Sequence, residues 1–165
     1  MDQRRVANVL AALLVISGIF FITQQPLQSG EKDYPVKFYT YGEGLERAKA
    51  ENRPVLVYIH SDTCHVCRAF LEDLSKYSDL REAMNRFIIV KVDFNSERLL
   101  AMKFGATGTP EFHILYPNGT VMEIDGKKVV YIGYAGTPDD QNARKKLIAF
   151  FDFAFEHFNR QMVMS

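Results

Sequence analysis

The sequence has no tryptophan and only two cysteines among its 165 residues. Two cysteines cannot build the multi-disulfide scaffold of small secreted domains, so that class is excluded. The chain also has no net charge, because 20 Lys and Arg residues balance 20 Asp and Glu residues. Without a positive excess to attract phosphates, we expect no nucleic-acid partner. The 47% apolar content is that of a chain with a buried core, and the length suits one domain.

A long apolar run lies near the N-terminus. It extends without a charge over 17 residues, from Val6 to Ile22, directly after Arg4 and Arg5. This length falls between the core of a signal peptide and a membrane-spanning helix, and no small-residue cleavage triplet follows it. We therefore expect residues 1–23 to form an uncleaved signal anchor, a transmembrane helix. A cleaved signal peptide is the alternative.

The predicted anchor determines how the rest of the chain is divided and where its domain is expected. Residues 24–32 have the composition of a short tether, and residues 33–165 form the predicted domain. Because arginines that flank a membrane helix stay in the cytoplasm, the domain is expected outside it. In a bacterium this would be the periplasmic side of the inner membrane.

Patterns typical of strands and helices alternate along the predicted domain. The expected strands are 36–41, 54–59, 87–94, 112–116 and 120–124, and the expected helices are 44–51, 64–77, 96–104 and 138–162. Asn118-Gly119 lies between the last two strands, which predicts a hairpin. Strands that alternate with helices and end in a hairpin predict an α/β fold with a mixed central sheet flanked by helices.

The two cysteines form a C-x-x-C motif, Cys64-His65-Val66-Cys67, at the start of a predicted helix. Free N–H groups and the positive end of the helix dipole stabilise a thiolate there. Cys64 can then attack a disulfide of another protein, and Cys67 can resolve the mixed disulfide. His65, when protonated, would stabilise the thiolate further and make the disulfide more oxidising.

Three other interpretations of the cysteine pair remain open. A zinc site would need a second pair of ligands, and although His60 and His65 are near, no second C-x-x-C or H-x-H cluster exists. A purely structural disulfide would close only a small loop and add little stability. The thiols could also be two unrelated buried groups. The redox interpretation is favoured, and it requires no metal or other cofactor.

A second motif, Gly108-Thr109-Pro110, precedes the strand predicted at 112–116. An X-Pro bond can be cis at modest cost. A cis Thr109-Pro110 bond would turn the Thr109 backbone toward an extended peptide beside the cysteines. An ordinary trans proline at a strand boundary is an equally good interpretation from the residues alone.

Together these segments resemble thioredoxin-fold proteins. The resemblance covers about 36–158 and rests on the segments VLVYIHSDTCHVCRAFLEDL, FIIVKVDFN, GATGTPEFHIL and the PNG turn. The chain resembles membrane-tethered extracytoplasmic thioredoxin-like proteins, the C-terminal domain of the DsbD type and the CHxC subgroup. The resemblance implies that Cys64 is the nucleophile, that Cys67 is the resolving thiol, and that Thr109 and Pro110 bind substrate.

The resemblance also implies a function. We expect a membrane-anchored protein thiol–disulfide oxidoreductase, in the reductase or isomerase direction, with protein thiols and disulfides as substrates and a membrane electron-transfer partner. The alternative is a non-catalytic thioredoxin-fold subunit that binds a partner within a membrane-associated complex.

Two departures from the family pattern motivate that alternative. Thr63 stands where a tryptophan commonly precedes the first cysteine, and Tyr58 aligns with the buried acid of thioredoxins. Loss of the acid leaves open how Cys67 loses its proton, for which Asp62, Glu111 or water are candidates.

Overall fold

The computed structural model of the chain describes residues 34–134 and 140–164. The predicted anchor and tether lie outside these ranges. Among the described residues, no helix combines the length and the apolar character needed to cross a membrane.

The described residues form strands and helices that largely follow the predicted alternation. In chain order they are β1 (Phe38–Tyr39), α2 (Tyr41–Glu51), β2 (Val55–His60), α3 (His65–Lys76), α4 (Ser78–Met84), β3 (Ile88–Asp93), α5 (Arg98–Phe104), β4 (Glu111–Leu115), β5 (Glu123–Ile124), β6 (Lys127–Lys128), β7 (Val130–Ile132) and α6 (Gln141–Met164).

A mixed five-stranded sheet lies at the centre, in the order β1-β3-β2-β4-β7. β1 and β2 run parallel to β3, whereas β4 runs antiparallel to both β2 and β7. All six residues of β2 are buried, as expected of an apolar strand in the middle of a covered sheet. This confirms the predicted α/β fold with a mixed sheet.

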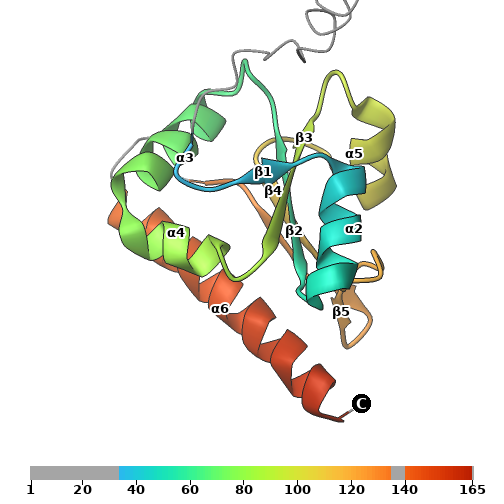
Figure 1. The fold of residues 1–165 in the computed structure, drawn as a ribbon. Helices are drawn as coiled ribbons and strands as arrows, with labels where there is room; N and C mark the ends of the chain where they lie inside the picture. The colour runs from blue at the N-terminus through green and yellow to red at the C-terminus, as the bar shows by residue number, and fades with distance from the viewer. Residues whose placement is uncertain (1–33, 135–139, 165) are drawn as a thin grey trace, which may run out of the picture. The chain divides into compact units, whose positions relative to one another are not determined.

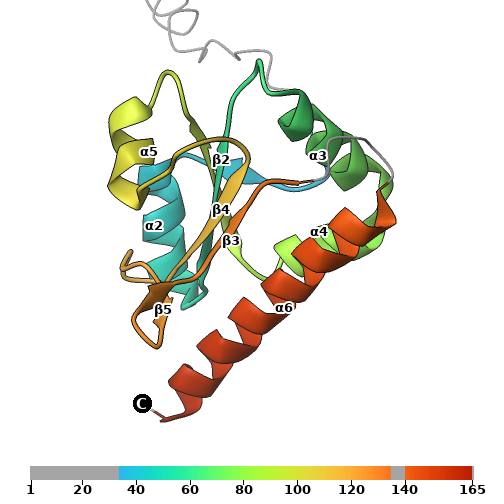
Figure 2. The same ribbon diagram turned by 180° about the vertical axis from the view of Figure 1, so that it is seen from behind.

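Helices cover both faces of the sheet (Figures 1 and 2). α3, α4 and α6 lie on one face, where Phe70, Leu80 and Phe151 join the larger apolar cluster. α2 and α5 lie on the other face, where Ala48 and Phe104 join the second cluster.

Close packing of α2 against the sheet depends on one glycine. A Cβ atom at Gly44 would lie 2.2 Å from Cγ2 of Val90 in β3, well inside van der Waals contact. Thr40 and Glu43 form a capping box that fixes where this helix begins.

Two parts of the fold differ from the predicted elements. The predicted helix 64–77 corresponds to α3 alone, and the short helix α4, which follows it almost directly, was not predicted. The predicted strand 120–124 joins β4 only through a bridge between Leu115 and Val121, and the strand that pairs with β4 in the sheet is β7. The turn at Gly119 nevertheless forms, with φ of 86° and a 2.9 Å hydrogen bond from its N–H to the carbonyl of Tyr116.

Candidate active site

The cysteine pair lies where the chain leaves the carboxyl end of β2 and enters α3. Cys64 is the N-cap of α3, and its Sγ accepts a 3.1 Å hydrogen bond from the backbone N–H of Cys67. Cys64 is half-buried, whereas Cys67 is 1% exposed, and both thiols are free. The predicted placement at a helix start is confirmed, and only one of the two sulfurs is accessible to another protein.

The surroundings of Cys64 favour its thiolate. Partial burial pulls the pKa of Cys64 upward, but hydrogen bonds from the Cys67 and Thr109 side chains and from the backbone N–H groups of Cys67 and Val66 outweigh it. The pKa of Cys64 therefore lies below its ordinary value, as a nucleophile requires.

The surroundings of Cys67 have the opposite effect. Burial, and then the bond with Cys64, raise the pKa of Cys67 to about 11, while Ser61 and Thr109 oppose the rise. Cys67 therefore keeps its proton at neutral pH. The two thiols differ as the roles of nucleophile and resolving group require.

The loop before β4 lies directly beside Cys64. The Thr109-Pro110 bond is cis, and the Cys64 Sγ contacts the Thr109 carbonyl oxygen at 3.5 Å. The Gly133 N–H, at the end of β7, donates a 2.8 Å hydrogen bond to the Pro110 carbonyl. The structure thus brings together both motifs that the sequence singled out, although they are 45 residues apart.

A buried carboxylate that the sequence did not identify as an anchor holds this loop. Glu111 is 1% exposed. Its Oε1 accepts hydrogen bonds from the Thr107 N–H (2.8 Å), the Thr107 hydroxyl (3.2 Å) and the Gly108 N–H (2.9 Å). Its Oε2 lies 3.0 Å from Nε2 of His113, which is also buried. Glu111 therefore has a structural task, and both of its oxygens are engaged.

Tyr58 lies beneath the cysteines on β2. Its ring stacks on Phe112, with centroids 5.2 Å apart, and contacts Phe70 of α3 at 5.0 Å. Its hydroxyl is buried and has no hydrogen-bond partner among the described residues. Burial raises the pKa of Tyr58 strongly, and the next largest causes are its interactions with Cys67. Phe70 lies one turn after Cys67 on the buried face of α3, so the side chain in place of the family's buried acid lies on the same side of the helix as the resolving thiol.

The two residues predicted to modulate the pair are both exposed. His65 opens α3 and points away from the core. The Thr63 hydroxyl lies 3.0 Å from that of Ser61. Neither residue buries the approach to Cys64, where the family commonly has a bulky tryptophan.

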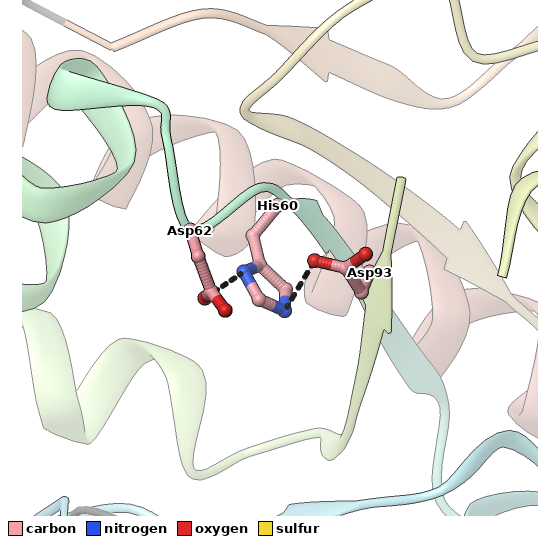
Figure 3. Close-up of side chains that lie close together, drawn as sticks. All are labelled: His60, Asp62 and Asp93. Carbon is pink, nitrogen blue, oxygen red and sulfur yellow. Dashed lines mark ion pairs between the residues drawn. The ribbon is translucent and has the colours of Figure 1, made fainter. Parts of the chain in front are cut away.

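A cluster of possible metal ligands lies nearby, formed by His60, Asp62 and Asp93 (Figure 3). One donor atom from each lies within 4.8 Å of the others. However, Nδ1 of His60 faces Asp62 at 3.8 Å, and Nε2 faces Asp93 at 4.0 Å. An imidazole ligates a metal through one nitrogen, so two carboxylates on different nitrogens do not converge on a single point. The arrangement is that of a histidine between two acids.

Comparison with known proteins supports the assignment of the fold. The sequence matches the thioredoxin-like domain family over residues 41–128. It is 33% identical over 69 residues to anterior gradient protein 3 of Mus musculus, covering 41% of this chain and 42% of that protein. The chain thus spans about two fifths of the length of the curated relatives it matches.

Solved structures agree with the family match. A thioredoxin from Thermus thermophilus superposes with a TM-score of 0.56 and 25% identity, covering 71% of this chain and 85% of its own. The reduced C-terminal domain of Neisseria meningitidis DsbD gives a TM-score of 0.51 at 15% identity, covering 68% and 92%. Because the family match spans more than half of the chain and the fold agrees, the protein belongs to the thioredoxin-like domain family and has the C-x-x-C dithiol of its oxidoreductases.

Proposed function

We propose that the protein is a membrane-anchored thiol–disulfide oxidoreductase that acts on protein cysteines outside the cytoplasm. The observation that carries the proposal is the asymmetry of the dithiol. Cys64 is accessible and has a lowered pKa, whereas Cys67 is buried and has a raised one. An accessible thiolate attacks a substrate disulfide, and a shielded second thiol within reach releases the product.

The surface around Cys64 suits a protein substrate. The Thr109 carbonyl lies against Cys64 in the loop directly before β4, where an extended peptide can pair with backbone groups. Thr63 and His65 leave the sulfur open on the helix side. The substrates are therefore cysteine-containing segments of other proteins.

The location and the direction of electron flow rest on the sequence. The uncharged run after Arg4 and Arg5 supports anchoring with the domain outside the cytoplasm. Resemblance to the DsbD type supports a reductase or isomerase that takes electrons from a membrane partner.

Trapping tests this proposal. In the full chain, Cys67→Ala leaves Cys64 without its resolving thiol, so mixed disulfides with substrate proteins should accumulate and disappear on addition of a reductant. Cys64→Ala is the matched control, because it retains only the buried thiol and should trap nothing. Equal adducts in the two variants would refute the proposal. A partner that stays bound to the variant with both cysteines changed to Ser would favour the non-catalytic binding subunit.

A further inference from the structure

In the resolving step Cys67 must lose its proton, and Tyr58 replaces the buried acid that thioredoxins commonly have near this thiol. With its pKa raised to about 11, Cys67 ionises rarely at neutral pH. Both oxygens of Glu111 are occupied by Thr107, Gly108 and His113. The Asp62 side chain is 92% exposed and faces His60.

The Tyr58 hydroxyl is a further buried polar group on this side of α3. Ser61 and Thr109 also favour the Cys67 thiolate, but they do not offset its burial. Tyr58 contacts Phe70, which lies one turn after Cys67 on the buried face of α3. Within residues 34–134 and 140–164 this hydroxyl has no hydrogen-bond partner, and the rings of four residues surround the Tyr58 ring: Phe38, His60, Phe70 and Phe112. An unpartnered buried hydroxyl is costly, so its presence calls for an explanation.

The chemistry of sulfur supplies one. A protonated thiol is a weak hydrogen-bond acceptor, whereas a thiolate is a strong one. The hydroxyl therefore has no good partner while Cys67 is a thiol and gains one when Cys67 ionises. An interaction that forms only along the reaction lowers its barrier.

We propose that the Tyr58 hydroxyl donates a hydrogen bond to the Cys67 thiolate as it forms, and so accelerates the release of substrate from Cys64. Tyr58 keeps its own proton throughout. The proton of Cys67 passes to solvent, and its sulfur attacks the Sγ of Cys64. The Cys64–Cys67 bond forms and the bond from Cys64 to the substrate sulfur breaks. The substrate sulfur leaves with the electron pair, so the substrate disulfide is reduced and the dithiol is oxidised. This inference rests on the proposed function and assigns one further residue to it.

Stopped-flow reaction of the reduced protein with the aromatic disulfide DTNB separates the two steps. The phase whose rate depends on reagent concentration reports the attack by Cys64. The phase whose rate does not depend on it reports the attack by Cys67. We expect Tyr58→Phe to slow the second phase by about tenfold or more, the factor that one hydrogen bond to a charged group supplies. The pH profile of that phase should move upward by about one unit, and the first phase should change by less than about twofold.

Two controls exclude a merely structural effect. Tyr131→Phe removes the hydroxyl of a half-buried tyrosine on β7, beside Phe112, and should leave both phases unchanged. The urea midpoint of Tyr58→Phe should be equal to or above that of the parent, because the lost hydroxyl has no partner. A second phase with unchanged rate and pH profile in Tyr58→Phe would overturn this inference while leaving the proposed function intact. Absence of the second phase in the unaltered protein would overturn both.

Discussion

Glu111 joins the fold to the candidate active site, so its replacement should affect both. The change with the largest expected effect is Glu111→Ala. It removes the acceptor of three hydrogen bonds from Thr107 and Gly108, and it leaves buried His113 without its partner. The loop that carries Thr109 then loses its anchor, directly beside Cys64.

The expected loss of unfolding free energy depends on how far each of these hydrogen bonds is shielded from water. A hydrogen bond to an ionised carboxylate contributes about 1.5–3 kcal/mol, so four such contacts would exceed about 6 kcal/mol if all were shielded from water. Thr107 is exposed, so water replaces its two bonds, whereas Gly108 is half-buried and His113 is 2% exposed. Counting the latter two contacts gives about 3 kcal/mol, which is a large share of the roughly 5–15 kcal/mol that stabilises a domain.

Urea unfolding measures the loss of stability. The absorbance of the Cys64 thiolate as a function of pH measures the effect on the active site. Glu111→Gln is the matched variant, because its amide oxygen still accepts from the loop, and it should lose only about 1 kcal/mol. Glu111→Ala should also move the Cys64 titration. Equal stability of the Ala and Gln variants, both close to the parent, would refute the anchoring role of this carboxylate.

Three further results are expected. Gly44→Ala should cost about 1–3 kcal/mol in urea unfolding, because the new methyl group would overlap Val90, whereas Gly42→Ala, with nothing within 4 Å, should cost nothing; equal effects would contradict the packing argument. Burial lowers the pKa of His60 below its unfolded value, so the stability that neutral His60 provides is present at neutral pH and is lost as the pH falls below about 6.5. His60→Gln should therefore reduce the loss of stability measured between about pH 7 and about pH 5. An unchanged slope in that variant would contradict this reasoning. Iodoacetamide at neutral pH should modify Cys64 alone, as peptide mass spectrometry can show. If Cys67 were modified before Cys64, the assigned roles of the two thiols would be reversed.

Much of the fold was predictable because local patterns determine it. The continuous apolar runs of β2 and β3 and the C-x-x-C motif at a helix start all lie within short windows of sequence. The end of α3 at Tyr77 was predicted, but α4 was not, because its N-cap is the same Tyr77, which makes no side-chain cap hydrogen bond and so gives no signal of a new helix. The sequence predicted strand 120–124 as the partner of β4, but β7 takes that place. Which segment pairs with β4 is not specified by a local pattern.

The positions of the site residues were only partly predictable. Cys64, Cys67 and Pro110 have distinctive motifs, so sequence sufficed to select them. The anchoring role of Glu111 and the orientation of Tyr58 depend on contacts between separate strands and helices. A polar residue within an apolar strand was the available signal in both cases, but it does not reveal its partner.

The reduction potential of the Cys64–Cys67 pair shows whether the dithiol cycles and in which direction electrons flow. The full chain in detergent is equilibrated in glutathione or dithiothreitol buffers, and the free thiols are then counted by mass after alkylation. We expect a reversible intramolecular disulfide with a potential nearer to about −270 mV, typical of a thioredoxin-like reductant, than to about −120 mV, typical of an oxidant. A potential near the latter value would contradict the reductase direction. Failure to form the disulfide in any buffer would contradict the redox function itself.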